Sequence, residues 1–184
     1  MATPIVMIVL LMAPYAAVRV LAAVTHRDLE LQGAAAIGLV LLFIFTGVGH
    51  FIQTEPMSEM LPPWVPARVL LVYLTGVLEF GIAAGFFFRK SRRFTGWIAA
   101  IVLVVFFPAN IYAAINHIPM GGHAWGPVYL LIRAPLQGMI LLWVYGFTIR
   151  RASQDKGKEA PHAFRPRSQL PEVSTPGQNR YRIE

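Results

Sequence analysis

The chain has 184 residues, of which 56% are hydrophobic and only 14% are charged, and its formal net charge is +7. Soluble domains average about 45–50% apolar and about 25% charged residues, so this composition indicates a membrane protein. The sequence contains no cysteine, which excludes a structural disulfide, a thiol nucleophile, a CxxC redox pair and a thiolate metal site.

The first apolar segment, residues 4–24, is the least regular candidate for a membrane span. Pro14 and Arg19 interrupt it, and no basic residue precedes it, whereas a cleaved signal peptide has a basic start. The first positive charges follow the apolar run, at Arg19 and Arg27, which favours a retained segment that starts outside the cytoplasm. We therefore predict that residues 1–32 form an additional N-terminal hydrophobic segment, an extra transmembrane helix. A removed or peripheral leader is the alternative.

Four further apolar blocks each reach the roughly 20 residues that a helix needs to cross about 30 Å of hydrocarbon. They are residues 33–52, 67–88, 95–116 and 128–148. The blocks predict an all-α fold in which residues 33–149 form a multi-pass transmembrane four-helix bundle.

Positive charges gather in two places along the chain. They are Arg89, Lys90, Arg92 and Arg93 in one connector, and Arg150, Arg151, Lys156 and Lys158 after the last block. Residues 53–66 and 116–127 contain no Lys or Arg. Because cytoplasmic loops carry an excess of Lys and Arg, we expect the N-terminus outside and the C-terminus in the cytoplasm.

Residues 150–184 are polar, basic and interrupted by prolines, so they lack the apolar residues that a core requires. We predict that they form a disordered cytoplasmic tail. The basic excess lies in this tail and in the turn at residues 89–93, where cytoplasmic retention and anionic lipid headgroups favour it. The net charge therefore indicates the lipid bilayer as partner, and we expect no nucleic-acid binding.

Glu79 lies inside an otherwise apolar span, where a carboxylate normally faces a bundle interior or a wet cavity. Other polar residues share helix faces with one another at a spacing of four. Together the candidate ligand-binding residues are Thr46, His50, Thr75, Glu79, Asn110, Arg133 and Gln137. Counted at 1.5 Å per residue, they lie from roughly 3 Å (His50) to about 18 Å (Glu79) below the outer ends of their spans. We expect a polar pocket that opens outward and has Glu79 at its floor.

Arg133 is the expected countercharge of Glu79, at an axial offset of about 10 Å that would need Gln137, Thr75 or water as a bridge. A buried pair that only fixes helix register is the alternative. His50 has a second interpretation too, as an interfacial residue bonded to a loop. No metal site is predicted, because the histidines follow no recognised ligand spacing. No catalytic residue is assigned, because no nucleophile is placed beside a base.

Short motifs recur in a fixed order along residues 33–148. They are Gly47-Val48-Gly49-His50-Phe51, Pro62-Pro63, Thr75-Gly76-Val77-Leu78-Glu79, Gly96-Trp97, Pro108-Ala109-Asn110, Arg133 and Pro135-Leu136-Gln137. This order resembles DoxX-like membrane proteins. The resemblance implies a compact four-helix bundle in the bacterial inner membrane, in a family named after a small subunit of a thiosulfate:quinone oxidoreductase. It also implies that His50, Glu79, Asn110, Arg133 and Gln137 lie inside the bundle. The segment before residue 33 departs from the four-span pattern.

Three functions remain open. The first is a redox-associated membrane subunit of a quinone-linked oxidoreductase, whose pocket holds a quinone or a similar lipophilic molecule without any covalent cofactor. The second is a non-catalytic membrane anchor or scaffold for a partner enzyme. A small-solute transporter is less favoured, because paired repeats and discontinuous helices are not evident.

Overall fold

The structure, a computed structural model, describes residues 2–150, which contain helices and no strand. In chain order the elements are α1 (Ala2–Thr25), α2 (Leu31–Ile52), α3 (Thr54–Glu59), α4 (Arg68–Phe87), α5 (Arg92–Ile115), the 3-10 helix η1 (His123–Tyr129), α6 (Leu130–Val144) and the π-helix η2 (Tyr145–Arg150). The predicted all-α fold is confirmed for this range. The predicted disordered tail lies, from residue 151 onward, outside the described residues.

Five helical segments of the described chain are long and apolar enough to cross a membrane. They are Thr3–Thr25, Leu31–Ile52, Arg68–Phe87, Arg92–Ile115 and His123–Arg150. The chain is therefore a multi-pass membrane protein, and the additional N-terminal hydrophobic helix is confirmed.

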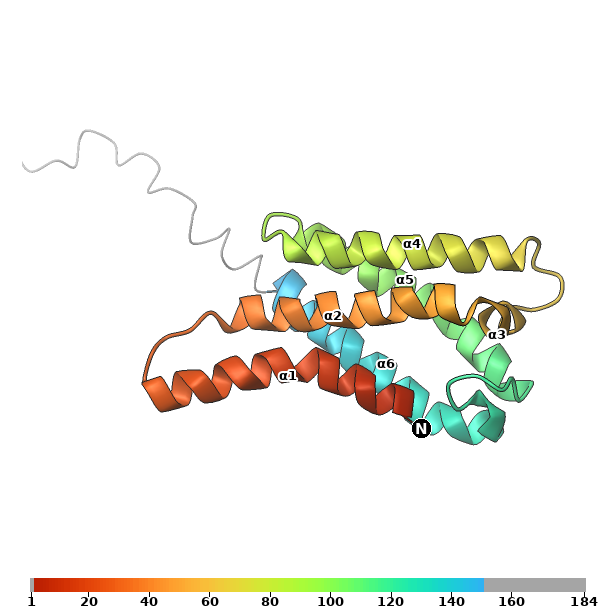
Figure 1. Cartoon of the computed structure of the whole chain (residues 1–184), viewed down its shortest axis with the longest axis horizontal. Coiled ribbons are helices and arrows are strands. Elements are labelled where there is room, and N and C mark those ends of the chain that lie inside the picture. Colours follow the sequence, from red (N-terminus) through yellow and green to blue (C-terminus); the bar gives the residue numbers. More distant parts are fainter. Residues whose placement is uncertain (1, 151–184) are drawn as a thin grey trace, which may run out of the picture.

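The five long helices lie side by side along the long axis of the molecule (Figure 1). α2 occupies the middle and packs against α1 on one side and α4 on the other, while α5 and α6 complete the bundle. α3 and η1 lie at one end, here called the α3 end, and the loop between α1 and α2 lies at the opposite end (Figure 1). One half of the length of each long helix therefore lies near the α3 end.

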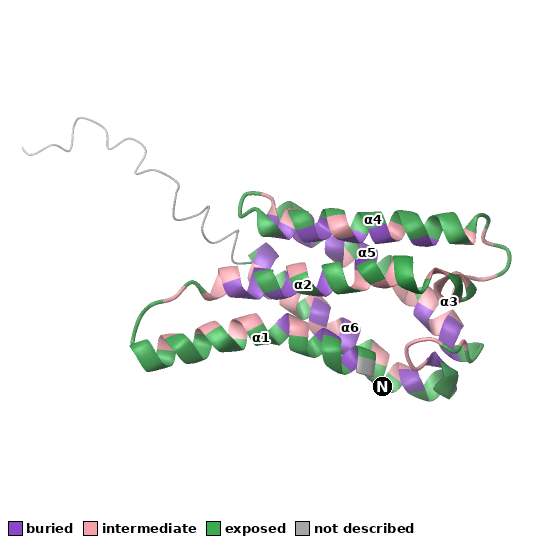
Figure 2. Cartoon of the chain, in the orientation of Figure 1, coloured by how far each residue is buried: buried purple, intermediate pink, exposed green. Residues whose placement is uncertain are grey.

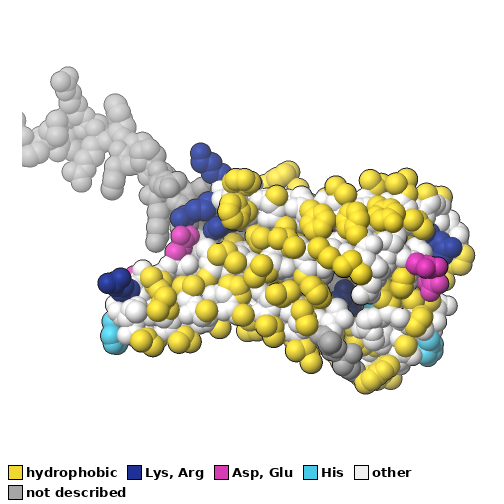
Figure 3. Space-filling view, in the orientation of Figure 1, with side chains coloured by type: hydrophobic (Ala, Val, Ile, Leu, Met, Phe, Trp, Pro, Cys, Tyr) yellow, Lys and Arg dark blue, Asp and Glu magenta, His cyan; other side chains and the backbone are white. Residues whose placement is uncertain are grey.

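Apolar side chains cover the outside of the bundle as well as its interior. The buried cluster includes Leu39, Phe43, Ile82, Phe86 and Val144, and buried residues line the inner helix faces (Figure 2). Yet large apolar residues of all five long helices are exposed, and they cover most of the visible surface (Figure 3). Such a surface would be costly in water and is suited to lipid tails.

α2 and α4 approach each other at a pair of glycines. A Cβ atom on Gly76 would lie 2.8 Å from the Cβ of His50 and 2.8 Å from a ring carbon of Phe51. A Cβ on Gly47 would lie 3.4 Å from the carbonyl oxygen of Gly76. Small residues at such crossings let membrane helices pack with their backbones in near contact. The residues that follow Gly47 on α2 are therefore held directly against α4.

α1 meets α2 at a second close contact, between Leu11 and Gly38. A Cβ on Gly38 would clash with the carbonyl oxygen of Leu11, and Leu11 itself is fully buried. α1 contains Pro14 and is bent, and its N-terminal part diverges from α2 toward the α3 end (Figure 1). The two helices therefore form a fork that widens from the Leu11 contact toward the α3 end.

The glycine crossing leads to a first prediction. Gly76→Ala should destabilise the protein by about 1–3 kcal/mol, because the added methyl overpacks against His50 and Phe51. Gly81→Ala, on the same helix, is the matched control, because a Cβ there meets nothing within 4 Å. Thermal unfolding in detergent measures both variants, and equal melting temperatures would contradict the proposed role of the crossing.

Candidate functional site

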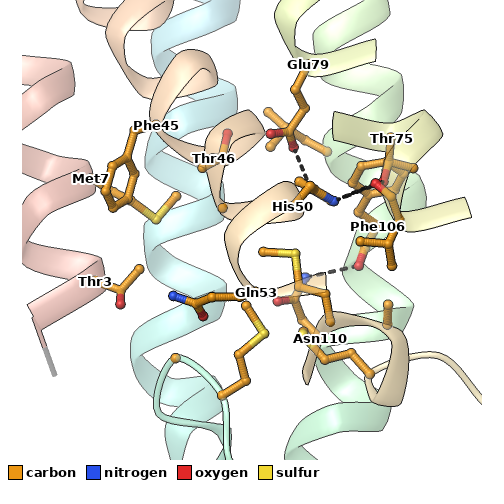
Figure 4. Close-up of a pocket in the computed structure, with 18 of the residues that line it drawn as sticks. Thr3, Met7, Phe45, Thr46, His50, Gln53, Thr75, Glu79, Phe106 and Asn110 are labelled. Atoms are coloured by element: carbon orange, nitrogen blue, oxygen red, sulfur yellow. Dashed lines mark hydrogen bonds and ion pairs between the residues drawn. The ribbon is translucent and has the colours of Figure 1, made fainter. Parts of the chain in front are cut away.

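One pocket of about 510 Å³ lies among the helices in the half of the molecule near the α3 end. Its lining includes all seven candidate residues, Thr46, His50, Thr75, Glu79, Asn110, Arg133 and Gln137. They come from α2, α4, α5 and α6, and Figure 4 shows several of them around the cavity. The structure thus brings together every polar residue that was predicted to form a pocket.

His50 and Glu79 form the closest charged contact in the pocket. His50 Nε2 lies 3.5 Å from Glu79 Oε1 (Figure 4). The other ring nitrogen, Nδ1, lies 3.1 Å from the carbonyl oxygen of Val72 and 3.0 Å from Thr75 Oγ1. A carbonyl oxygen can only accept, so Nδ1 carries a hydrogen and donates it. Nε2 of His50 therefore faces Oε1 of Glu79, at the one side of the imidazole that Val72 and Thr75 leave open.

The second carboxylate oxygen of Glu79 has no partner. Glu79 is only 7% exposed, and its Oε2 is buried without a hydrogen bond to any described residue. A buried polar atom without a partner is costly, so such atoms call for a specific explanation. Glu79 therefore offers one oxygen to His50, and its other oxygen is buried and unsatisfied next to the pocket.

Arg133 binds Asn110 and does not reach Glu79. Its Nε donates to Asn110 Oδ1 at 3.0 Å, and its NH1 lies 3.6 Å from the sulfur of Met7. Within residues 2–150, no carboxylate lies within salt-bridge distance of this guanidinium. Arg133 and Glu79 thus make no direct ion pair, in agreement with their predicted axial offset, and their charges interact only over a longer distance. The contact position beside Glu79 is taken by His50, which the sequence analysis did not predict as its partner.

Two amides of the pocket each make a hydrogen bond that joins α5 to α6. Asn110 Nδ2 donates to the carbonyl of Phe106 at 3.0 Å, which orients its oxygen toward Arg133. Gln137 Nε2 donates to the carbonyl of Leu103 at 2.5 Å and links α6 to α5. Thr46, by contrast, turns its hydroxyl to its own helix, at 3.1 Å from the carbonyl of Leu42. These residues shape the wall, whereas Glu79 and Arg133 keep unused hydrogen-bonding capacity.

A family model described as a domain of unknown function (DUF8561) matches residues 39–148. The chain belongs to the DUF8561 family. The match begins within α2, ends in η2 and contains all seven candidate residues. No curated protein and no solved structure matches the chain.

α1 lies outside the DUF8561 match and still contributes to the pocket, through Thr3 and Met7. Sequence reasoning missed both residues. Nothing in their pattern distinguishes them from other side chains of an apolar helix. Only the bend of α1 and its contact with α2 bring its N-terminal part beside Arg133.

His123 is a second pocket residue that the sequence analysis did not include among the candidates. It is 4% exposed, lines the pocket and packs edge-on against the ring of Tyr129. Its Nδ1 lies 2.6 Å from the carbonyl of Met120, so Nδ1 donates and leaves Nε2, which is buried without a partner, as an acceptor. The preceding Gly121 and Gly122 have positive φ angles, and this Gly-Gly pair was a signal that the loop folds back.

The described residues contain no group of three His, Cys, Asp or Glu side chains that could hold a metal ion. The pocket lining instead includes the guanidinium donor of Arg133 and the side chains of Glu79 and His123, whose atoms Oε2 and Nε2 are buried without partners. A molecule with an acceptor oxygen and a hydroxyl group could use this set once one of the two buried acceptors turns toward the cavity.

The Arg133 contact leads to a second prediction. Asn110→Leu should lower stability by about 2–3 kcal/mol, because it leaves the guanidinium without its acceptor. Asn116→Leu is a matched control, since Asn116 Nδ2 likewise donates to the carbonyl four residues earlier but is exposed and does not contact Arg133. Chemical or thermal unfolding in detergent measures the difference. Equal losses in the two variants would show that the bond to Arg133 contributes nothing.

Proposed function

We propose that this protein is a redox-associated membrane subunit whose pocket binds the head group of a quinone or a similar small lipophilic molecule. The observation that carries the proposal is the convergence of Arg133, Glu79 and His50 in one cavity with otherwise mainly apolar walls. Small-molecule sites are typically cavities of about 300–1,000 Å³ with apolar walls and few polar groups, and this pocket falls in that range.

The polar groups fit a head group with two oxygens. Arg133 can donate to a carbonyl oxygen, and the carboxylate of Glu79 can accept a hydrogen bond from a hydroxyl group when its buried, unpaired Oε2 turns toward the ligand. When bound, a quinone supplies two-electron redox chemistry in which its oxygens gain or lose protons. The pocket therefore suits both the oxidised and the reduced form.

The His50 and Glu79 pair provides the proton site. A ligand hydroxyl can give its proton to the carboxylate of Glu79, while Nε2 of His50, 3.5 Å from Oε1, can hold a second proton of the pair. The pair then gains one positive charge as the ligand gains one negative charge, so the charge of the pocket and ligand together is unchanged. A partner oxidoreductase subunit supplies or accepts the electrons.

The resemblance to DoxX-like proteins supports this proposal, as does the position of the basic residues. Arg89, Lys90 and Arg93 follow α4 at the end opposite α3, and basic side chains are visible at that end in Figure 3. By the positive-inside rule, that end faces the cytoplasm of a bacterial cell, and the α3 end faces the periplasm. The pocket then lies in the outer half of the inner membrane.

Substitutions of the two charged residues test the proposed function. Glu79→Gln and Arg133→Met should each weaken binding of a decyl-substituted benzoquinone by about tenfold or more, because each removes a hydrogen bond to a charged group. Glu55→Gln and Arg68→Met, at exposed or half-buried positions outside the pocket, are the matched controls. Equilibrium binding to the full chain in proteoliposomes measures the effect. Unchanged affinity in both pocket variants contradicts the proposal.

A membrane anchor or scaffold is the second candidate, because pocket residues also join helices. Arg133 to Asn110, Gln137 to Leu103 and His50 to Thr75 are all bonds between different helices. If these residues serve only to hold the bundle, the same two pocket variants lower the melting temperature and yield, and the wild-type chain binds no quinone. Measuring stability and binding on the same samples separates the two functions.

The orientation is tested independently. A fluorescent protein that matures only in the cytoplasm should fluoresce when fused after Glu184 and stay dark when inserted at Gly121, because one span, His123–Arg150, separates Gly121 from residue 184. Fluorescence of the Gly121 insertion would reverse the orientation. Insertion beside Lys90 is the positive control for a cytoplasmic turn.

A further inference from the structure

The pocket continues sideways into the fork between α1 and α2. From α1 it includes Thr3 and Met7, and from α2 it includes Phe45, Val48 and Ile52. Phe45 and Val48 are 37% and 39% exposed, so this part of the wall reaches the side of the bundle. Figure 4 shows Met7 and Phe45 next to each other at this side. The Leu11 contact with Gly38 closes the fork at its narrow end.

The space-filling view shows the same opening from outside. On the face shown in Figure 3, a hollow between the apolar side chains has a Lys or Arg side chain at its base. Arg133 is the only Lys or Arg among the described residues that line the pocket. A cation at the base of an opening in an apolar lateral surface is accessible to a molecule dissolved in the lipid.

The α3 end is bounded by other parts of the chain. Met57 of α3, Met60 directly after α3 and Met120 of the loop before η1 line the pocket there, together with the buried His123. Methionine side chains are flexible and fill irregular gaps. The pocket was expected to open outward, and at the α3 end it is bordered by α3 and by this loop. Its side toward the lipid lies between the diverging helices α1 and α2.

Met7 marks the point where a ligand oxygen would replace a protein atom. Its sulfur lies 3.6 Å from Arg133 NH1, and a thioether sulfur is a weak acceptor for a charged donor. A carbonyl or hydroxyl oxygen at this point makes the stronger, charge-assisted hydrogen bond. The sulfur of Met7 therefore occupies the position beside Arg133 NH1 that the oxygen of a ligand entering through the fork would take.

We propose that the pocket takes its ligand from the bilayer through the fork, and that the ligand is an amphiphile with a single lipophilic tail. Its head group lies against Arg133 and Glu79, and its isoprenoid or acyl tail leaves between Met7 and the Phe45 and Val48 face of α2. This inference rests on the proposed function for the head group. It adds the route of access and the tail as a determinant of specificity.

The test compares a tailed with a tailless ligand. A decyl-substituted dimethoxymethylbenzoquinone and the same head group without the chain are bound to the full chain in proteoliposomes. Val48→Trp narrows the fork, so the decyl compound should bind about tenfold more weakly, as expected when at least two methylene groups lose their burial. The tailless compound should bind within about twofold of the wild type, because its head-group contacts are unchanged. Ile44→Trp, one turn away on α2, exposed and outside the pocket lining, is the matched control.

Thr3→Trp narrows the fork from the α1 side and keeps the test decisive if Val48→Trp fails to fold. Equal effects of the fork and control variants on the decyl compound overturn the inference, as does equal weakening of both ligands. If the wild type binds the tailless compound normally, neither of these two results affects the proposed function. Absence of binding of either compound to the wild type overturns the proposed function and this inference with it.

A spin label gives a second readout without any ligand. Because the sequence has no cysteine, Thr46→Cys carries the only thiol, and a nitroxide attached there reports from the pocket wall. Collisions with oxygen, which partitions into lipid, should exceed collisions with a water-soluble nickel chelate. The same label at Leu74, exposed on the outer face of α4, gives the lipid reference. Dominant collisions with the nickel chelate at position 46 show access from water and overturn the lateral route.

Discussion

The close crossing of α2 and α4 is the constraint on which the rest of the site depends. Without a side chain at Gly47 and Gly76, the two backbones come near enough for His50 to reach Val72 and Thr75 with one nitrogen and Glu79 with the other. A buried carboxylate is expensive in lipid unless it has such a partner. The glycines thus allow the carboxylate of Glu79 to be buried at its depth in the bundle, and they place it in the lining of the pocket.

Some side-chain atoms of the pocket residues hold helices together, whereas others are left for a ligand. Asn110 and Gln137 use their amides to join α5 to α6, so their contribution is to hold the walls. Glu79 Oε2 and His123 Nε2 are buried without partners among the described residues. A bundle built only for stability gains nothing from such atoms, because each costs free energy when it is left unsatisfied. Their presence is what favours a bound molecule over a purely architectural site.

Residue spacing was sufficient to predict the helices and the pocket but not its internal pairing. Thr75 and Glu79, or Arg133 and Gln137, share a face because they are four apart, and depth along each span follows from the helical rise. Rotation of one helix against another depends on tertiary packing, so the sequence could not show that His50 and not Arg133 meets Glu79. The contribution of α1 was equally hidden, because the position of Met7 depends on the contact of Leu11 with Gly38 and on the bend of the helix.

The burial of the Arg133 guanidinium has an electrical consequence. Within residues 2–150 no carboxylate pairs with it directly, and Glu79 acts on it only over a longer distance. In a medium of low dielectric constant such a cation attracts electron-rich oxygen strongly. Under the proposed function, the cavity would therefore favour, among molecules of similar shape, those whose oxygen carries the greatest negative charge, and would repel cationic amphiphiles that partition into the same layer of the membrane.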